Sequence, residues 1–208
     1  MGAKRLPASE RRAQLLRVGR AVFARRGFES ASMEEIAKRG GVSKPIVYEH
    51  FGGKEGLYAV VVDREREYLV ARIAEAIASG TPRERFESAA LAFLKYAEEQ
   101  PDGFAVLIQD SPLMTGPLLS SLMSDVADRV SGLFASEFKK AGYDAKTAPI
   151  YAHALIGMVT FVGLWWMQHR KPSVEVVASH LASLGWMGLR HLPNKPEPIG
   201  RKKKKPSG

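Results

Sequence analysis

The chain has 208 residues, of which 45% are apolar and 25% are charged, and its formal net charge is +9. This composition predicts a soluble globular protein with a packed core, organised as one domain or two modest ones. The absence of cysteine excludes disulfides, thiolate metal sites and cysteine nucleophiles, and it fits a reducing cytoplasm.

Basic residues are concentrated at the two ends of the chain. Residues 1–50 contain eleven Lys or Arg against five Asp or Glu, and residues 193–208 contain six against one. A basic N-terminal segment indicates a surface that meets phosphate, although basic ends also occur as solubilising segments. Residues 193–208, with four prolines and the run Arg201–Lys205, predict a disordered tail, and whether it contacts DNA is left open.

The N-terminal third predicts three helices. Leu15, Gly19, Val22 and Phe23 form one face of a first helix that Gly27 ends. Ser32 with Glu35 three residues later predicts a capping box, so a second helix starts at Met33 and stops at Gly40-Gly41.

A third, short helix follows almost at once. Ser43 can cap it, and Pro45 falls in its first turn, where the missing N–H costs nothing. Two short helices joined by a turn of three or four residues have the proportions of a helix-turn-helix. Val42, Val47 and Phe51 supply the inward face of this pair. The outward side chains are suited to entry into a DNA major groove: Lys44, Pro45, Tyr48, Glu49 and His50.

The remainder of the chain also shows helical spacing and almost no strand pattern. Apolar residues recur at multiples of four from Gly53 to Ser79, and Gly80-Thr81-Pro82 ends that helix. An all-α fold is therefore predicted, with further helices at 83–99, 103–110, 117–141, 147–169 and 173–191.

The stretch Ala148–Met167 carries no formal charge over twenty residues, which is long enough for a membrane span. His153 and Thr160 interrupt it and no second span is present, so a helix buried in a bundle or a subunit interface is the favoured interpretation. Residues 1–12 carry four basic side chains with no apolar run behind them, unlike a secretory signal. A cytoplasmic protein is expected, and a membrane-associated helical protein remains the alternative.

Residues Glu10–Tyr58 resemble the N-terminal domain of the tetracycline-repressor (TetR) family of bacterial transcriptional regulators. The segments VFARRGF, SMEEIAKRGGVSK, VYEHF and GKEGLY fall in the family's order and spacing. Beyond them the likeness is one of kind, because the family has a variable helical ligand-binding and dimerisation domain there. The resemblance implies a DNA-binding domain at 1–55, a ligand-binding and dimerisation domain at 56–192 and the tail at 193–208.

The same resemblance implies which residues contact DNA, whereas Ile46 and Glu49 depart from the small or polar residues often found at their positions and leave the base preference open. The implied DNA-contacting positions are Ser32, Ser43, Lys44, Pro45, Tyr48, His50 and Lys54.

One short reading helix gives little specificity, so a homodimer on a two-fold symmetric operator in double-stranded DNA is expected. The apolar helix 147–169 and the helix 173–191 are the natural dimer surface. Resemblance to the family implies that these two helices of each subunit form a four-helix bundle.

Large apolar side chains between residue 83 and residue 169 are mostly core, and the resemblance implies that a subset of them lines a pocket for an effector. Because Arg and Lys are sparse among them, a largely apolar effector is favoured, and its binding is expected to release a repressor from DNA. The candidate ligand-binding residues are Phe86, Leu94, Phe104, Leu107, Met114, Leu122, Met123, Val126, Met158, Phe161, Val162, Trp165 and Trp166.

Nothing in the sequence favours an enzyme. It has no nucleophile elbow, phosphate-binding glycine loop, dinucleotide fingerprint or zinc-protease motif. Its five histidines show no metal-ligand pairing beyond the loose spacing of His180 and His191, and His153 on an apolar helix is interpreted as a packed histidine. No cofactor and no metal are expected.

Overall fold

The computed structural model describes residues 6–109, 117–140 and 142–193, and within these ranges it contains helices and no strand. The all-α prediction is confirmed. Charged tail residues 194–208 and the candidate Met114 lie outside the described residues. The elements are α1 (Ala8–Ser30), α2 (Met33–Gly40), α3 (Lys44–Phe51), α4 (Lys54–Ala76), α5 (Pro82–Glu99), α6 (Pro101–Gln109), α7 (Pro117–Lys140), a 3₁₀ turn (Ala145–Thr147), α8 (Ala148–His169) and α9 (Val174–Arg190).

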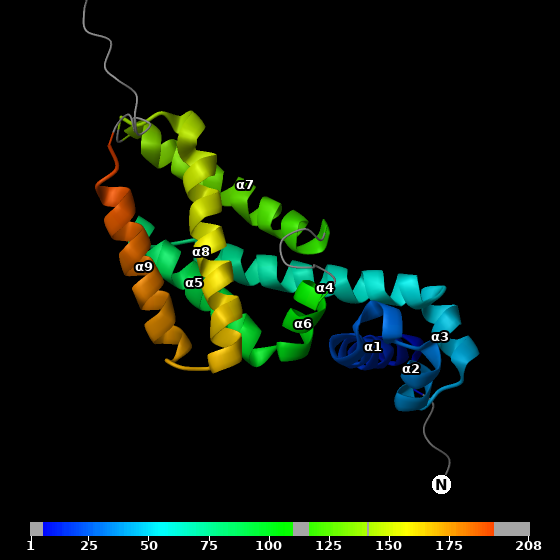
Figure 1. Ribbon diagram of the computed structural model, residues 1–208. Helices are drawn as coiled ribbons and strands as arrows, with labels where there is room; N and C mark the ends of the chain where they lie inside the picture. Colours follow the sequence, from blue (N-terminus) through cyan, green and yellow to red (C-terminus); the bar gives the residue numbers. More distant parts are fainter. Residues whose placement is uncertain (1–5, 110–116, 141, 194–208) are drawn as a thin grey trace, which may run out of the picture.

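Helices α1, α2 and α3 gather at one end of the molecule, and α4 runs from them toward the other helices (Figure 1). The inward side chains of α1, α2 and α3 are fully or almost fully buried, among them Leu15, Val22, Ile36 and Val47. Helix α1 changes direction at Gly27, whose φ of 72° is open to glycine but strained for other residues. The three-helix N-terminal arrangement is therefore confirmed.

The other helices form a bundle in which α5 packs on α9 and on α4, and α7 packs on α8 (Figure 1). Helix α6 packs back against α1, so the bundle touches the N-terminal helices through α6 as well as through α4. Phe93 and Phe104 meet edge to face in the centre, with ring centroids 5.7 Å apart, and both are buried. The N-terminal group of helices is thus mounted on the bundle at two places.

Most helix ends fall within two or three residues of the prediction, and the two-residue difference at the start of α6 has a physical reason. The Pro101 break was expected to exclude this residue from the helix, yet α6 begins at Pro101. The first turn of a helix does not need the N–H that proline lacks, so proline is accepted there. Pro101 therefore stops α5 and also begins α6.

Helix α8 belongs to the apolar segment Ala145–His169, which is long and apolar enough to cross a membrane. The described residues contain one helix of this length and hydropathy, and the core helix of a soluble protein can have the same length and hydropathy. One side of α8 is buried in the bundle, including Ala152, Val159 and Trp166. Its opposite side exposes Phe161 and Trp165, so its apolar character is only partly used within one chain.

Candidate DNA-reading head and ligand cavity

Helices α2 and α3 meet across a tight turn. Ser32 caps α2 by accepting a hydrogen bond from the Glu35 N–H at 3.1 Å. The Glu35 carboxylate lies with Arg39 at 2.7 Å and with Arg26 at 3.7 Å, instead of returning to the cap. Gly41 ends α2 with a φ of 63°, a left-handed conformation that favours glycine. The turn predicted from these residues is confirmed.

Helix α3 has one buried face and one open face. Val47 is fully buried and Phe51 nearly so, and the Arg12 guanidinium lies 4.7 Å from the centre of the Phe51 ring. Tyr48 is 44% exposed, and His50 is half-buried beside Phe51. The open face carries Lys44, Pro45, Tyr48 and Glu49.

The three remaining candidate DNA contacts surround α3. Ser32 and Ser43 are exposed at the starts of α2 and α3, and the Ser43 side chain makes no capping hydrogen bond. Lys54 is different, because its ammonium donates to the Glu29 carbonyl at 3.1 Å and lies 4.5 Å from the centre of the Phe28 ring. The Ser43 hydroxyl is thus open to a partner and the Ser32 hydroxyl, which accepts from Glu35, can still donate its proton, whereas Lys54 is already engaged.

The beginning of α4 is seated directly on the end of α3. A Cβ on Gly56 would collide with the backbone carbonyl of Phe51, so only glycine allows this approach. The next residue, Leu57, is fully buried against α1, where a Cβ on Gly19 would lie 3.1 Å from the Leu57 side chain. Backbone contact therefore fixes α4 to the reading helix without flexible side chains between them.

A polar cluster joins α1, α4 and α5 further along. Arg20 of α1 donates to Glu65 of α4 at 3.0 Å and to Gln100 at the end of α5 at 3.2 Å. The buried Tyr96 hydroxyl donates to the other Glu65 oxygen at 2.8 Å. Burial, followed by the nearby Glu65 carboxylate, raises the pKa of the Tyr96 phenol, so the hydroxyl stays protonated and remains a donor. One carboxylate thus links three helices.

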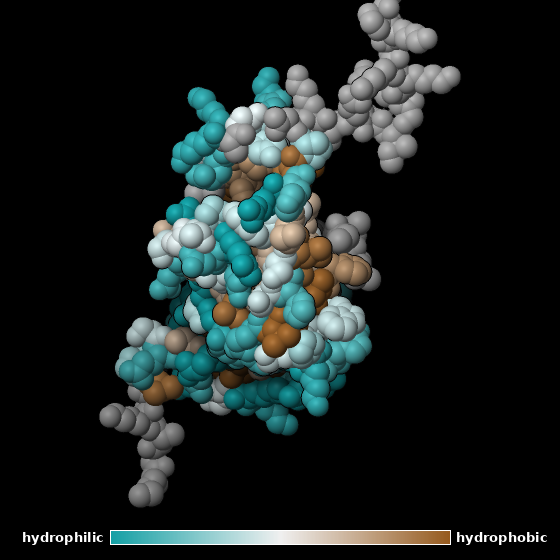
Figure 2. Space-filling view, turned by 90° about the vertical axis from the view of Figure 1, so that its left-hand side faces the viewer, coloured by the Kyte–Doolittle hydropathy of each residue, from teal (hydrophilic) through white to brown (hydrophobic). Residues whose placement is uncertain are grey.

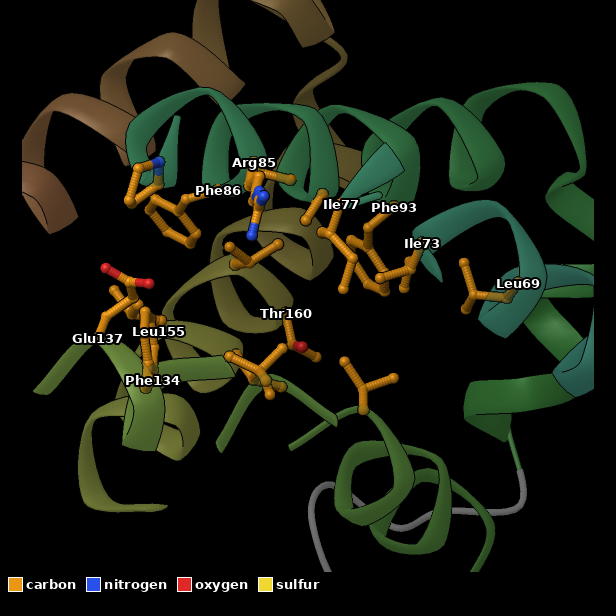
Figure 3. A pocket seen from close by; sticks show the side chains of 17 residues that line it. Leu69, Ile73, Ile77, Arg85, Phe86, Phe93, Phe134, Glu137, Leu155 and Thr160 are labelled. Carbon is orange, nitrogen blue, oxygen red and sulfur yellow. The ribbon is translucent and has the colours of Figure 1, made fainter. Parts of the chain in front are cut away.

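A cavity opens between α4, α5, α7 and α8 (Figure 3). Its walls are almost entirely aliphatic and aromatic, and the polar side chains among the lining residues are Arg85, Glu137 and Thr160. The apolar lining consists of Leu69, Ile73, Ile77, Pro82, Phe86, Ala89, Ala90, Phe93, Val126, Val130, Phe134, Leu155, Ile156 and Val159.

Two of the candidate ligand-binding residues, Phe86 and Val126, line this cavity. Others are core side chains that face elsewhere: Leu94, Phe104 and Leu107 are buried, and the Trp166 indole donates to the Pro172 carbonyl at 2.6 Å.

Met158 and Val162 are half-buried against the core, whereas Phe161 and Trp165 are 61% and 47% exposed. Leu122 and Met123 belong to α7, but their side chains lie outside the described part of the chain.

The sequence did not single out the α4 wall or Arg85. Leu69 and Ile73 were recognised as a regular apolar row, which is also the pattern of ordinary core. Arg85 lies in the first turn of α5, where a charged residue is normally solvated. No signal in the pattern distinguishes these residues from core and surface.

Comparison with known proteins shows to which family this arrangement of helices belongs. The profile described as bacterial regulatory proteins of the tetR family matches residues 15–61, and that of the tetracyclin repressor-like C-terminal domain matches residues 72–200. The HTH-type transcriptional activator FasR of Mycolicibacterium smegmatis is 31% identical over 192 residues, which make up 91% of this chain and 87% of the relative. The chain belongs to the TetR family.

Solved structures agree with this assignment. A TetR-like transcriptional regulator from Rhodococcus sp. RHA1 has 30% sequence identity and a TM-score of 0.72, covering 90% of this chain and all of that one. The fatty acid degradation regulator FadR from Bacillus halodurans, at 18% identity and a TM-score of 0.71, shares the fold. This TetR-family chain is a DNA-binding transcriptional regulator, not an enzyme. Among the described residues no group of three or more His, Asp or Glu side chains could hold a metal ion.

The seat of α4 on α3 makes a testable prediction. Replacing Gly56 by Ala places a Cβ against the Phe51 carbonyl, and the two helices must separate. We expect Gly56→Ala to lower the free energy of unfolding by about 1–3 kcal/mol, the usual cost of overpacking, and to weaken DNA binding. Urea unfolding and DNA-binding titration measure the two effects.

Gly132→Ala in α7 is the matched control, because a Cβ there meets nothing within 4 Å. It should raise the free energy of unfolding by up to about 1 kcal/mol, the helix preference of alanine over glycine. If Gly56→Ala behaved like this control, α4 would not be seated on the α3 backbone.

Proposed function

We propose that this TetR-family regulator is a cytoplasmic, ligand-responsive repressor. In this proposal it binds a two-fold symmetric operator as a homodimer and is released when a largely apolar small molecule enters the cavity. Residues 1–55 read DNA, and residues 56–192 bind the ligand and the second subunit. The observation that carries the proposal is the continuity of α4, which is seated on the reading helix at Gly56 and lines the cavity from Leu69 to Ile77.

The open face of α3 supports the DNA-reading part. Lys44 and Tyr48 lie one helical turn apart and point away from the core, as major-groove contacts must. Ser32 and Ser43 flank them at two helix starts, where hydroxyls and backbone N–H groups suit phosphate. His50 and Lys54 have neighbours in the protein and are proposed as peripheral contacts.

The links between bundle and head support the coupling. A ligand that separates α4 from α5 or α7 tilts α4. Because α4 is long, the tilt reaches α1, α2 and α3, which form the DNA-reading head. The helix spans about 35 Å at 1.5 Å per residue, so a small rotation displaces its far end. Arg20 and Glu65 transmit the same displacement to α1 through direct hydrogen bonds.

The exposed apolar surface of α8 and α9 supports the dimer. Phe161 and Trp165 of α8 are one turn apart, and Leu184 and Met187 of α9 are 65% and 57% exposed. Figure 2 shows an apolar patch on the side of the molecule where these helices lie. Because this surface accounts for the apolar character of α8, pairing with a second α8 and α9 is favoured over a membrane.

One experiment tests the whole proposal. DNA that binds the purified protein is selected from a random library, and its affinity is then measured with and without medium-chain aliphatic compounds that bind the cavity. A palindromic selected site and a loss of DNA affinity on ligand binding are expected, with ligand affinity lowered by the same factor on DNA. Ligands that bind equally well with and without DNA would contradict the response.

A second candidate function has one specific observation in its favour. The relative with 31% identity, FasR, is named a transcriptional activator. If the ligand strengthened DNA binding in the same titration, the ligand would stabilise the DNA-bound state, and transcription measured with the selected site upstream of a promoter would separate activation from co-repression.

The reading helix gives the next prediction. Tyr48→Ala should weaken binding to the selected DNA by about 1–3 kcal/mol, the contribution of one good base contact, without changing the helix content. Tyr68→Ala in α4 is the control, since Tyr68 is 47% exposed against 44% for Tyr48 and lies outside the head. Equal DNA affinity of the two variants would remove Tyr48 from the interface.

The dimer surface gives a prediction that separates assembly from folding. Phe161→Asp and Leu184→Asp introduce charge where the single chain is exposed, so each should yield a folded monomer by light scattering and circular dichroism. Tyr68→Asp, an exposed substitution elsewhere, should remain dimeric. A wild-type protein that is monomeric at micromolar concentration, or aspartate variants that stay dimeric, would contradict this surface.

A further inference from the structure

Arg85 is a cation in an otherwise apolar cavity. It lies in the first turn of α5, and Figure 3 shows its side chain reaching into the space between the lining residues. Its Nε is fully buried and has no hydrogen-bond partner among the described residues. The other arginine of this turn, Arg83, is exposed. The sequence thus places two arginines two positions apart, and the second of them is turned inward.

Arg85 as a whole is half-buried, but a buried Nε–H without a partner is unfavourable, because an N–H that loses water must regain a hydrogen bond elsewhere. Glu137, the one carboxylate among the residues that line the cavity, lies across from Arg85 in Figure 3. Its Oε1 accepts from Lys140 at 2.9 Å and its side chain is 50% exposed. Glu137 therefore has Lys140 as its ion-pair partner, and Arg85 forms no ion pair among the described residues.

Each of three cavity walls is a row of side chains that follows the length of one helix. Leu69, Ile73 and Ile77 of α4 follow one another at intervals of one helical turn. So do Arg85, Ala89 and Phe93 on α5, and Val126, Val130 and Phe134 on α7. From its first to its last side chain each row advances eight positions, or about 12 Å along its helix. The space between them is consequently elongated.

Arg85 lies toward one end of this space. Helices α4 and α5 follow each other through a short connection, and in Figure 3 Ile77 lies between Arg85 and Phe93, whereas Leu69 lies at the far side, beyond Ile73. Arg85, Phe86 and Glu137 gather at the Ile77 end. Beyond them the walls become uniformly apolar, apart from Thr160.

We infer that the cavity binds a single-chain amphiphile whose anionic head group, a carboxylate or a phosphate, pairs with Arg85 while its aliphatic chain lies between the α4, α5 and α7 rows. A guanidinium can donate two parallel hydrogen bonds to either head group, which satisfies the buried Nε. This inference rests on the proposed ligand response and adds the chemistry of the ligand: neutral apolar compounds leave Arg85 unpaired and bind less tightly.

The test compares three probes with one chain length and different heads: dodecanoate, dodecyl phosphate and dodecanol. Calorimetric titration, below the concentrations at which the probes form micelles, is carried out on the wild-type protein, Arg85→Gln, Arg85→Lys and Arg83→Gln. Arg83→Gln removes the same charge from the same turn of α5 but on its exposed side, so it corrects for general electrostatic attraction.

We expect the wild-type protein to bind at least one anionic probe about tenfold or more tightly than dodecanol, the difference that one charge-assisted hydrogen bond makes. Arg85→Gln should lose that preference and keep its dodecanol affinity, Arg85→Lys should keep part of it, and Arg83→Gln should match wild type. Unfolding curves establish that Arg85→Gln is folded, and Arg85→Lys provides a second reading if it is not.

Equal binding of acid, phosphate and alcohol by the wild-type protein would overturn the inference, as would loss of preference in Arg83→Gln alone or binding of none of the probes. Its failure is distinguishable from failure of the proposed function. If dodecanol binds as well as dodecanoate and both weaken DNA binding, the ligand response stands and the Arg85 pairing fails. If the anionic probes bind through Arg85 and leave DNA affinity unchanged, the pairing stands and the response fails.

Discussion

The close approach of α4 to the end of α3 is the constraint on which the rest of the molecule depends. Most helices in a bundle touch through side chains, which adjust by rotating when a neighbour moves. At Gly56 no side chain intervenes, and the Phe51 carbonyl occupies the place where a Cβ would be. In the proposed function α3 therefore follows α4 as one body, and a displacement of the far part of α4 moves the face of α3 that is proposed to contact DNA.

At its other end, inside the bundle, α4 contacts its neighbours through side chains. Its side chains there line a cavity, Leu69 and Ile73 also pack into the core, and Arg66 forms an ion pair with Asp125 of α7 on the surface. In the proposed response, a helix that is held by a backbone contact at one end and borders a cavity at the other takes one position with ligand and another without it. Arg20 and Glu65 lie between the two ends, so this part-buried polar cluster stands between the cavity and α3 along α4.

The sequence predicts the local features well and the tertiary ones poorly. Gly41, Ser32 and Pro45 act within a few residues of themselves, so their roles can be inferred without the partners. Cavity lining depends instead on which face of a helix meets which neighbour. Adjacent indoles show this: Trp166 is buried and bonded to a backbone carbonyl, whereas Trp165, rotated by one position, faces solvent. Arg85 was missed because nothing local distinguishes an inward arginine from an outward one.

Helix α8 has no indifferent side. One face packs on α5, where Gly163 leaves room for the Phe93 ring, and the same face lines the cavity one turn earlier at Val159, whereas another face displays Phe161 to solvent. A substitution therefore alters folding, ligand contact or surface pairing according to its angular position, and few positions are free to accept polar residues. The even hydrophobicity that imitates a membrane span is the sum of three separate selective requirements on one cylinder. Hydropathy averaged along such a helix reports how many contacts it serves, and the medium around it has to be inferred from the direction in which each side chain points.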